Sequence, residues 1–369
     1  SAQGKSGQFE VTVPSWRPDV HGSADLVEEI VRIAGIDAVP STPLPRTPGV
    51  ARPVLTELQR RVRRARRTLA ARGLVEAVTY SFISRREAEL FGGGTSSLEL
   101  ANPISLELSS MRPSLLPGLL AATRRNANRG NADVAMFELG QAYRGTSAGD
   151  QFVSASGVRT ATAHAAGAGR HWSGHAANVD LFDAKADATA VLEALGLDTA
   201  KAQVTRDAPA YYHPGRSGTL RLGPKLVLAY FGELNPRALS ALDMNGPAVA
   251  FEVFLDSLPP EKRKSRARAP IEESDLMALT RDFAFVLDRD IGAADVVRAA
   301  QGADKTLIRH VAVFDMFEGG KLAEEGKKSL AIEVTLQPAT QTLTDKEIEA
   351  VSERIIAAVS KATGGEIRS

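Results

Sequence analysis

The sequence predicts a multidomain α+β protein. Its 369 residues exceed what one hydrophobic core usually organises, so two or three domains are expected. In the middle of the chain, short β segments follow one another with few βαβ repeats, which indicates an antiparallel sheet with helices beside it. Two breaks, one rich in proline and one rich in basic residues, separate this middle region from a shorter segment on either side.

The composition excludes several classes of function. Lys+Arg 45 against Asp+Glu 44 leaves no global charge that would attract nucleic acid, so such contacts need local basic surfaces. The absence of cysteine rules out disulfides, thiolate metal sites and a cysteine nucleophile. No apolar run approaches a bilayer span and no signal peptide is present, so we expect a cytoplasmic protein without membrane contact. The polar start resembles the cut edge of a longer protein.

The first predicted unit covers residues 1–42. Residues 9–14 alternate like a strand, and a helix follows in which Leu26, Ile30 and Ile33 are expected to face inward. The stretch 39–49 then holds four prolines, which neither a helix nor a central strand tolerates. A unit this small buries little core by itself.

The second predicted unit covers residues 53–258. It opens with an amphipathic helix over 54–73 and continues with the helix 181–196. Gly/Ala-rich loops are expected between the elements, notably over 145–170. The predicted strands are 77–82, 136–143, 219–223, 225–234 and 248–255.

The third predicted unit covers residues 275–369, after a basic linker over 259–274. Its strands are predicted at 282–288, 310–322, 328–337 and 366–368, with helices over 293–303 and 345–364. Thr344 and Glu347 have the spacing of a capping box, and Gly364 supplies a helix stop. Strand–helix–strand–strand–helix–strand is the ferredoxin-like order, which many RNA-binding modules share.

No complete active site can be recognised from the residues. GKSG at residues 4–7 lacks the first glycine of a phosphate-binding loop, and no Ser/His/Asp arrangement carries a recognisable elbow. His171 and His175 have helical i, i+4 spacing but lie among Gly and Ser without an obvious third ligand.

Four carboxylates, Asp19, Asp25, Glu28 and Glu29, gather at the start of the first helix. Acids in a first helical turn are stabilised by the helix dipole, which accounts for the last three without a metal. It does not account for Asp19, which lies six residues before Asp25. Oxygen ligands on a turn and a helix start suit Mg²⁺, which binds through a few carboxylates and keeps several waters. Both interpretations stay open on the residues alone.

Two sets of basic residues are candidates for contact with RNA or another subunit. The first is the run RRVRRARR at 60–67, which contains Arg60, Arg61, Arg63 and Arg64 and is either a phosphate-tracking face or a solvated helix side. The second set consists of Arg281, Lys305, Arg309, Lys327 and Lys328 in the third unit. Phenylalanines 283, 285, 314 and 317 are candidates for base stacking, although at strand spacing they are more often core.

These residues and motifs together resemble the beta subunit of bacterial phenylalanyl-tRNA synthetase. The resemblance runs in order over nearly the whole chain, and its motifs are VPSWRPDV…DLVEEIVRIAGID, VTYSF, NPIS…MRPSLLPGLL, FELG, HPGRSG, FGELNP, RDFAFVLD, FDMFEGGKL and TLTDKEI. It implies a small domain that abuts the alpha subunit (1–42), a copy of the class II synthetase core (53–258) and a ferredoxin-fold anticodon-binding domain (275–369). The family's editing domain has no counterpart here, so editing is not assigned.

The resemblance also implies ligands and roles. In the family, Mg²⁺ shared with the alpha subunit is held by an Asp, a second acid six residues on, and two later consecutive glutamates, and Asp19, Asp25, Glu28 and Glu29 match that spacing. This favours the cation site. An active class II core needs an arginine two residues before a glutamate on the ATP-binding strand and a second arginine elsewhere, whereas MFELGQAY has no arginine before Glu138. The chain is therefore expected to be catalytically degenerate and to bind no ATP itself.

The resulting hypothesis is the non-catalytic beta subunit of phenylalanine–tRNA ligase. The implied assembly has two alpha and two beta subunits, in which this chain scaffolds the alpha subunit and binds tRNA(Phe). The alternative is a stand-alone RNA-binding module that has kept synthetase-like domains.

Overall fold

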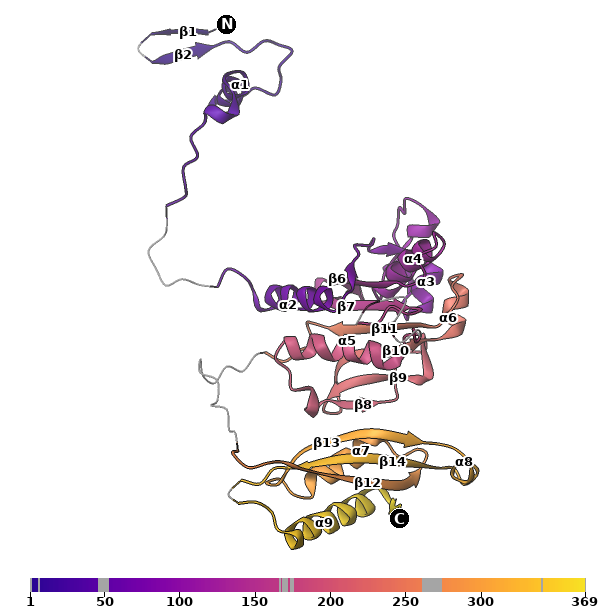
Figure 1. Ribbon diagram of the computed structural model, residues 1–369. Helices are drawn as coiled ribbons and strands as arrows, with labels where there is room; N and C mark the ends of the chain where they lie inside the picture. The colour runs from indigo at the N-terminus through magenta and orange to yellow at the C-terminus, as the bar shows by residue number, and fades with distance from the viewer. Residues whose placement is uncertain are drawn as a thin grey trace. The chain divides into compact units, whose positions relative to one another are not determined.

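Figure 1 shows the computed structural model, which describes residues 2–5, 7–45, 53–165, 167, 172, 176–260, 274–339 and 341–368. The chain divides into two compact units, Ser1–Leu55 and Thr56–Ser369. In these described ranges, no helix combines the length and the apolar character that crossing a membrane requires.

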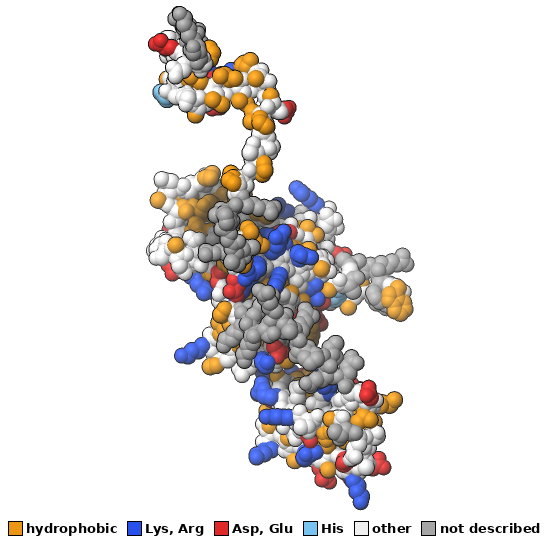
Figure 2. All heavy atoms as spheres, turned by 90° about the vertical axis from the view of Figure 1, so that its left-hand side faces the viewer, with side chains coloured by type: hydrophobic (Ala, Val, Ile, Leu, Met, Phe, Trp, Pro, Cys, Tyr) orange, Lys and Arg blue, Asp and Glu red, His pale blue; other side chains and the backbone are white. Residues whose placement is uncertain are grey.

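The first unit is a hairpin followed by a helix. β1 (Ala2–Lys5) and β2 (Gln8–Val11) pair antiparallel, and α1 (Ser23–Ala34) is followed by the short 3-10 helix η1 (Ile36–Ala38). The prediction that α1 buries its apolar face is wrong for Ile30 and Ile33, which are 65% and 76% exposed. Nothing in the described part of this unit covers that face, and so small a unit has little to cover it with. Apolar side chains lie open on this unit in Figure 2.

The second unit contains a seven-stranded sheet with strand order β3-β6-β7-β11-β10-β9-β8. Every pair is antiparallel except β3 with β6, as expected for an α+β protein. The strands are β3 (Val75–Glu76), β6 (Ala135–Tyr143), β7 (Gln151–Thr160), β8 (Gln203–Thr205), β9 (Tyr212–Leu222), β10 (Leu226–Leu234) and β11 (Ala248–Phe254).

Helices pack on both faces of this sheet, so each face has its own hydrophobic cluster. α2 (Glu57–Ala71) and α5 (Leu181–Ala194) cover one face (Figure 1). On the other face lie α4 (Leu116–Ala127) and α6 (Pro236–Ala241). α3 (Arg85–Leu90) and the two-stranded sheet of β4 (Phe82–Ile83) and β5 (Ser110–Met111) lie between α2 and α4 in the sequence. The 3-10 helices are η2 (Ser96–Leu98), η3 (Leu106–Leu108), η4 (Ala148–Asp150) and η5 (Thr199–Lys201).

The central strand β7 contradicts the prediction of a loop over residues 145–170. Its middle reads Ser-Ala-Ser-Gly, which carries none of the bulky side chains that usually mark a strand. Small residues are required there because β7 is buried between β6 and β11. A Cβ on Gly157 would lie 2.5 Å from the ring of Phe251.

The predicted strand over residues 77–82 is also wrong. After β3 the chain makes one more sheet hydrogen bond, from the Ala77 amide to the Phe137 carbonyl, and then leaves the sheet. The Thr79 hydroxyl instead donates to Glu138 at 2.6 Å, and Val78 and Tyr80 point to solvent with exposures of 90% and 75%. The hydrogen bond from Thr79 to Glu138 thus holds this segment as an exposed loop, although its alternating sequence predicts a strand.

The carboxyl-terminal part confirms the predicted ferredoxin-like order. Its four-stranded antiparallel sheet has the order β13-β14-β12-β15, and the core contains Ile348, Val351, Ile355 and Val359 of the last helix, all buried. The predicted capping box of Thr344 and Glu347 is present, and Gly364 adopts φ 70°. The elements are β12 (Leu279–Asp288), α7 (Ala293–Gly302), β13 (Ile308–Phe317), α8 (Lys321–Glu324), β14 (Lys327–Leu336), α9 (Asp345–Thr363) and β15 (Glu366–Ile367).

Candidate functional site

Three of the four carboxylates of the first unit form hydrogen bonds or ion pairs with groups of the same unit. Arg17 Nη2 lies 2.6 Å from Asp19 Oδ2 and 2.7 Å from Glu29 Oε1, and Arg32 adds a second bond to Glu29 at 2.8 Å. Asp25 accepts the backbone amides of His21 and Gly22, both at 2.8 Å, as a helix cap. Glu28 is exposed.

These contacts account for the acidity of the cluster. The Arg17 guanidinium holds the pKa of Asp19 at about 2. Arg17 and then Arg32 hold that of Glu29 at about 2. The pKa of Asp25 is lowered by the two amides it caps. All three carboxyl groups are therefore anionic at neutral pH, which is the form that a cation requires.

The donor type fits Mg²⁺, but the arrangement does not. Among the described residues, no three or more Asp, Glu or His side chains converge as metal ligands. The position shared by Asp19 and Glu29 is taken by the Arg17 guanidinium, which donates to both carboxylates.

Strand β6 contains Glu138, the glutamate of the MFELGQAY segment, and this glutamate lies in a buried ion pair. Arg112 Nη1 is 2.9 Å from Glu138 Oε1, and the side chain of each residue is 4% exposed. Arg112 also donates to the Gln141 carbonyl and the Thr79 hydroxyl, both at 2.9 Å. Glu138 thus fixes neighbouring segments of the chain and presents no free carboxylate.

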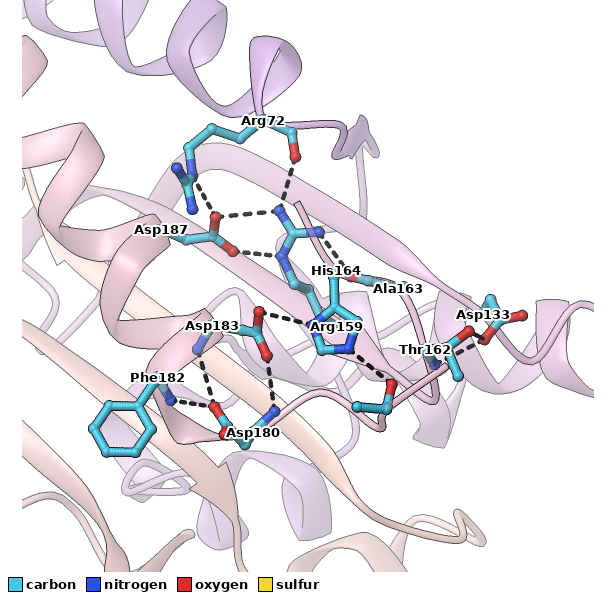
Figure 3. Close-up of polar contacts among 11 residues, drawn as sticks. Arg72, Asp133, Arg159, Thr162, Ala163, His164, Asp180, Phe182, Asp183 and Asp187 are labelled. Carbon is cyan, nitrogen blue, oxygen red and sulfur yellow. Dashed lines mark hydrogen bonds and ion pairs between the residues drawn. The ribbon is translucent and has the colours of Figure 1, made fainter. Parts of the chain in front are cut away.

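A second buried network lies on the opposite face of the sheet, where α2, β7 and α5 meet (Figure 3). Asp187, fully buried on α5, accepts Nε of Arg159 and Nε of Arg72, each at 2.6 Å. Arg159 also donates to the carbonyls of Ala163 and Arg72 at 2.8 and 2.9 Å. Arg159 and Asp187 are buried and bonded within the protein, so this pair is structural.

The arginine run on α2 divides into structural and exposed members. Arg61 donates to the carbonyls of Leu255 and Leu258 at 2.9 and 3.0 Å, so it joins α2 to the chain that follows β11. Arg63 and Arg64 are exposed, and Arg60 is half-buried. Arg61 is therefore committed to the fold.

Two loops expose large apolar side chains next to the β4–β5 pair. Val78 and Tyr80 precede β4, whereas Ile104 and Leu106, which are 91% and 84% exposed, precede β5. The backbone joins the two loops to the pair through bonds from the Arg112 amide to the Ser81 carbonyl and from the Leu100 amide to the Ser109 carbonyl. We call these four side chains the apolar loop surface. Because β4 and β5 are antiparallel, the two loops leave the pair at opposite ends, so each loop offers its own pair of exposed apolar side chains.

The predicted basic residues between 275 and 369 also divide by exposure. Arg281, Lys305 and Arg309 are exposed and Lys327 is half-buried. Lys328 is only 6% exposed and donates to the Arg289 carbonyl at 3.0 Å, and burial lowers its pKa. Lys328 therefore does not belong to an RNA-facing surface in this structure.

The four phenylalanines considered for base stacking also differ in exposure. Phe283 and Phe285 are core residues of β12, 7% and 0% exposed, whereas Phe314 and Phe317 on β13 are 58% and 50% exposed. Only the β13 pair can stack on a base. His171, His175 and residues 261–273 of the basic linker lie outside the described residues.

Comparison with known protein families shows which family the chain belongs to. The family model described as "Phenylalanyl tRNA synthetase beta chain CLM domain" matches residues 40–255, more than half of the chain. The chain belongs to the phenylalanyl-tRNA synthetase beta-chain family. Two further models match it, the "Ferredoxin-fold anticodon binding domain" over residues 274–368 and the "tRNA synthetase B5 domain" over residues 1–36.

Curated relatives agree with the family. The phenylalanine–tRNA ligase beta subunit of Bradyrhizobium diazoefficiens is 56% identical over 361 residues, which is 98% of this chain and 45% of that protein. The beta subunit of Rhodopseudomonas palustris is 56% identical over 367 residues, 99% of this chain and 46% of that protein. This beta-chain family member thus spans about half the length of the curated relatives it matches.

A solved structure of a pyrrolysyl-tRNA synthetase from Desulfitobacterium hafniense is a more distant neighbour of this beta chain. It is 18% identical with a TM-score of 0.41, covering 63% of this chain and 73% of the other. At that score the likeness does not establish a shared fold.

One group on the sheet face of this beta chain was missed by the sequence reasoning. Glu252 on β11 is 3% exposed and lines a cavity together with Arg144. The available signal was a single acid in the otherwise apolar strand AVAFEVF, where a charge is costly unless it is satisfied.

Proposed function

We propose that this chain is a non-catalytic part of phenylalanine–tRNA ligase that scaffolds the alpha subunit and binds tRNA(Phe). The observation that carries the proposal is the in-order match over 98% of the chain to a beta subunit of that ligase. In the assembly of two alpha and two beta subunits, the alpha subunit activates phenylalanine with ATP and transfers it to tRNA. The chain acts in the cytoplasm, where translation occurs.

The lack of catalysis by this chain follows from its buried polar groups. Glu138 is neutralised by Arg112, and no arginine precedes it on β6. The cavity on the same face of the sheet has a single arginine, Arg144, among its lining residues. A class II core with its fold kept and its nucleotide site lost is the arrangement that these contacts support.

Contact with the alpha subunit is assigned to the apolar loop surface. Its four side chains are 75% to 91% exposed, although Val, Tyr, Ile and Leu gain free energy when they are removed from water. Tyr80 also offers the aromatic anchor that interfaces favour. The exposed apolar side of α1 supports a second contact, since Ile30 and Ile33 lie uncovered in the described residues.

Contact with tRNA is assigned to the anticodon-binding domain through β13 and its neighbours. Arg309, Phe314 and Phe317 are exposed on this edge strand, and Lys305 precedes it. Phosphate-binding cations beside rings that can stack on unpaired bases are the combination that single-stranded RNA requires.

Mg²⁺ at Asp19, Asp25, Glu28 and Glu29 is part of the proposal under one condition. The Arg17 guanidinium has to leave Asp19 and Glu29, because it occupies the position that a cation shared with the alpha subunit would take. Hard carboxylate oxygens supply the ligand type that Mg²⁺ prefers.

Two measurements test the proposed function. Gel filtration with and without the alpha subunit distinguishes a ligase subunit, which co-elutes with its partner, from a stand-alone RNA-binding module, which elutes alone. ATP–pyrophosphate exchange with phenylalanine is expected only when the alpha subunit is added. Exchange by the purified chain alone would overturn the non-catalytic assignment.

The residues of the apolar loop surface allow a sharper test of the scaffold role. Replacing Val78 and Ile104 with Ser should weaken co-elution with the alpha subunit by about tenfold or more, because two exposed anchors lose their burial. The matched control is Val204→Ser, because Val204 is exposed on β8 and lies outside this surface. Equal effects of both changes would contradict the assignment.

A further inference from the structure

A cavity of about 280 Å³ lies on the face of the seven-stranded sheet opposite α2 and α5. Its walls are largely aromatic. Phe91 packs on Tyr211 with ring centroids 4.8 Å apart, and Phe254 packs on Tyr230 and Phe152 at 5.2 and 5.7 Å. This volume is at the small end of ligand cavities, so the cavity suits a compact molecule with a flat apolar body.

A carboxylate with no cation partner forms part of this cavity. Glu252 is 3% exposed and accepts hydroxyl hydrogens from Ser114 at 2.5 Å, Tyr211 at 2.9 Å and Tyr212 at 3.3 Å. No Lys, Arg or His of the described residues forms a direct ion pair with Glu252, and Arg144 acts on it only through its charge, without contact. Burial raises its pKa, and the three hydroxyls oppose that rise. A cation in the cavity would satisfy a charge that the protein leaves unpaired.

A guanidinium without a carboxylate partner is also part of the cavity lining. Arg144 is exposed, and its Cζ atom lies 4.1 Å from the centroid of Phe152 and 5.6 Å from that of Phe254. The rings hold the guanidinium by cation–π attraction and leave its N–H donors available. In the described part of the chain, no carboxylate forms an ion pair with Arg144, so its charge remains available to an anionic group.

We propose that this cavity binds a free amino acid with an aromatic side chain. Its ammonium pairs with Glu252, its carboxylate pairs with Arg144, and its ring lies against the aromatic walls. One zwitterion therefore satisfies both unpaired charges, whereas an amine or an acid satisfies only one. The inference goes beyond the function proposed above and does not depend on it, because tRNA and the alpha subunit are assigned to other surfaces.

The test uses the purified chain without the alpha subunit and titrates three small molecules by calorimetry. L-Phenylalanine carries both charges, 2-phenylethylamine only the ammonium, and 3-phenylpropionate only the carboxylate. For a ligand of this size we expect L-phenylalanine to bind with a dissociation constant of roughly 0.1–1 mM. Each analogue should bind at least about tenfold more weakly, because one buried or stacked charge stays unpaired.

Two variants assign the charges to their residues. In Arg144→Gln, 2-phenylethylamine should bind about as well as L-phenylalanine, because the carboxylate has lost its partner. In Glu252→Gln, L-phenylalanine should lose its advantage over 3-phenylpropionate. Arg237→Gln on α6 is the matched control, since Arg237 is exposed and does not line the cavity. It should leave all three affinities unchanged.

If Glu252→Gln fails to fold, Arg144→Gln still tests the proposal, because Arg144 is exposed and its replacement should leave the fold intact. The proposal is overturned if L-phenylalanine shows no saturable binding below about 10 mM, a limit well above the expected range. It is also overturned if the unsubstituted chain binds the three molecules equally, or if Arg144→Gln leaves their order unchanged.

Discussion

Asp187 and Arg159 form an ion pair in which Nε lies 2.6 Å from Oδ2 and the side chains are 0% and 2% exposed (Figure 3). They belong to α5 and β7, and Arg72 at the end of α2 completes the group. One buried carboxylate thus joins three elements that are far apart in the sequence. Removing one partner from such a pair leaves an uncompensated buried charge.

Asp187→Asn is therefore expected to weaken the core by about 3–5 kcal/mol. Amide hydrogen exchange in β7 and α5 measures this locally, which suits a chain of several domains. Their protection should fall by roughly a hundredfold or more. Asp198→Asn is the control, because Asp198 pairs with Lys201 on the surface at 2.8 Å and such pairs contribute about 0–1 kcal/mol. Similar losses in both variants would show that the buried pair has no special role.

The His164 imidazole is expected to give the core a pH-dependent stability. Its Nδ1 lies 3.0 Å from Asp183 and its Nε2 lies 2.8 Å from the Ala177 carbonyl, so both nitrogens face acceptors and the protonated ring is favoured. Asp183, and then the Ala177 carbonyl, raise the pKa of His164. The stabilisation is therefore complete below the unfolded pKa of about 6.5 and is lost as pH rises through the higher folded pKa.

Urea unfolding of the core from pH 5.5 to 8.5 checks this, with His164→Gln as the variant. The difference between parent and variant should be largest at the acid end and shrink as the pH rises. His310→Gln, an exposed histidine on β13, is the control and should give no such trend. A difference that stays constant with pH would contradict the expected titration.

Replacing Arg17 should make the first unit a better cation site. Arg17→Gln removes the guanidinium that lies between Asp19 and Glu29, so Asp19 and the Oε1 atom of Glu29 become free for Mg²⁺, while Arg32 stays on Oε2. Titration calorimetry of the chain with MgCl₂ should show binding at least about tenfold tighter than in the parent, because a fixed competing cation is gone.

The matched control for Arg17 is Arg32→Gln, which removes the same charge from the same unit. Arg32 contacts only the Oε2 side of Glu29, so Arg17 stays in place and Mg²⁺ should gain little. Equal gains in both variants would show that net charge alone governs binding and that Arg17 does not block a site.

The exposed and structural arginines of α2 should behave differently. Arg63→Gln together with Arg64→Gln is expected to weaken association with tRNA or the alpha subunit and to flatten its salt dependence, because two surface cations are lost. Arg61→Gln should instead lower the stability of the core, since it loses its bonds to the Leu255 and Leu258 carbonyls. Binding measured from 50 to 200 mM salt distinguishes the two. An unchanged salt slope for the double variant would mean that this helix face is merely solvated.

The carboxyl-terminal fold was predictable because its signals are local. The buried side chains of α9 recur every three or four residues, and its capping box joins residues three positions apart, so the contacts that form the helix lie between residues close in the sequence. Long-range packing decided the rest. β7 could not be recognised because its neighbours β6 and β11 impose the small residues that hide a strand from propensity.

Residue patterns alone were enough to predict the family, the two kinds of secondary-structure pattern and the set of carboxylates at the start of α1. Which charges are free depends on how the chain folds. It pairs Asp19 with Arg17, buries Lys328, commits Arg61 to the fold and brings Arg144 and Glu252, 108 positions apart, to one cavity. The physical reason is that residue type fixes a charge, whereas burial and the nearest opposite charge, which set its availability, depend on segments brought together by folding.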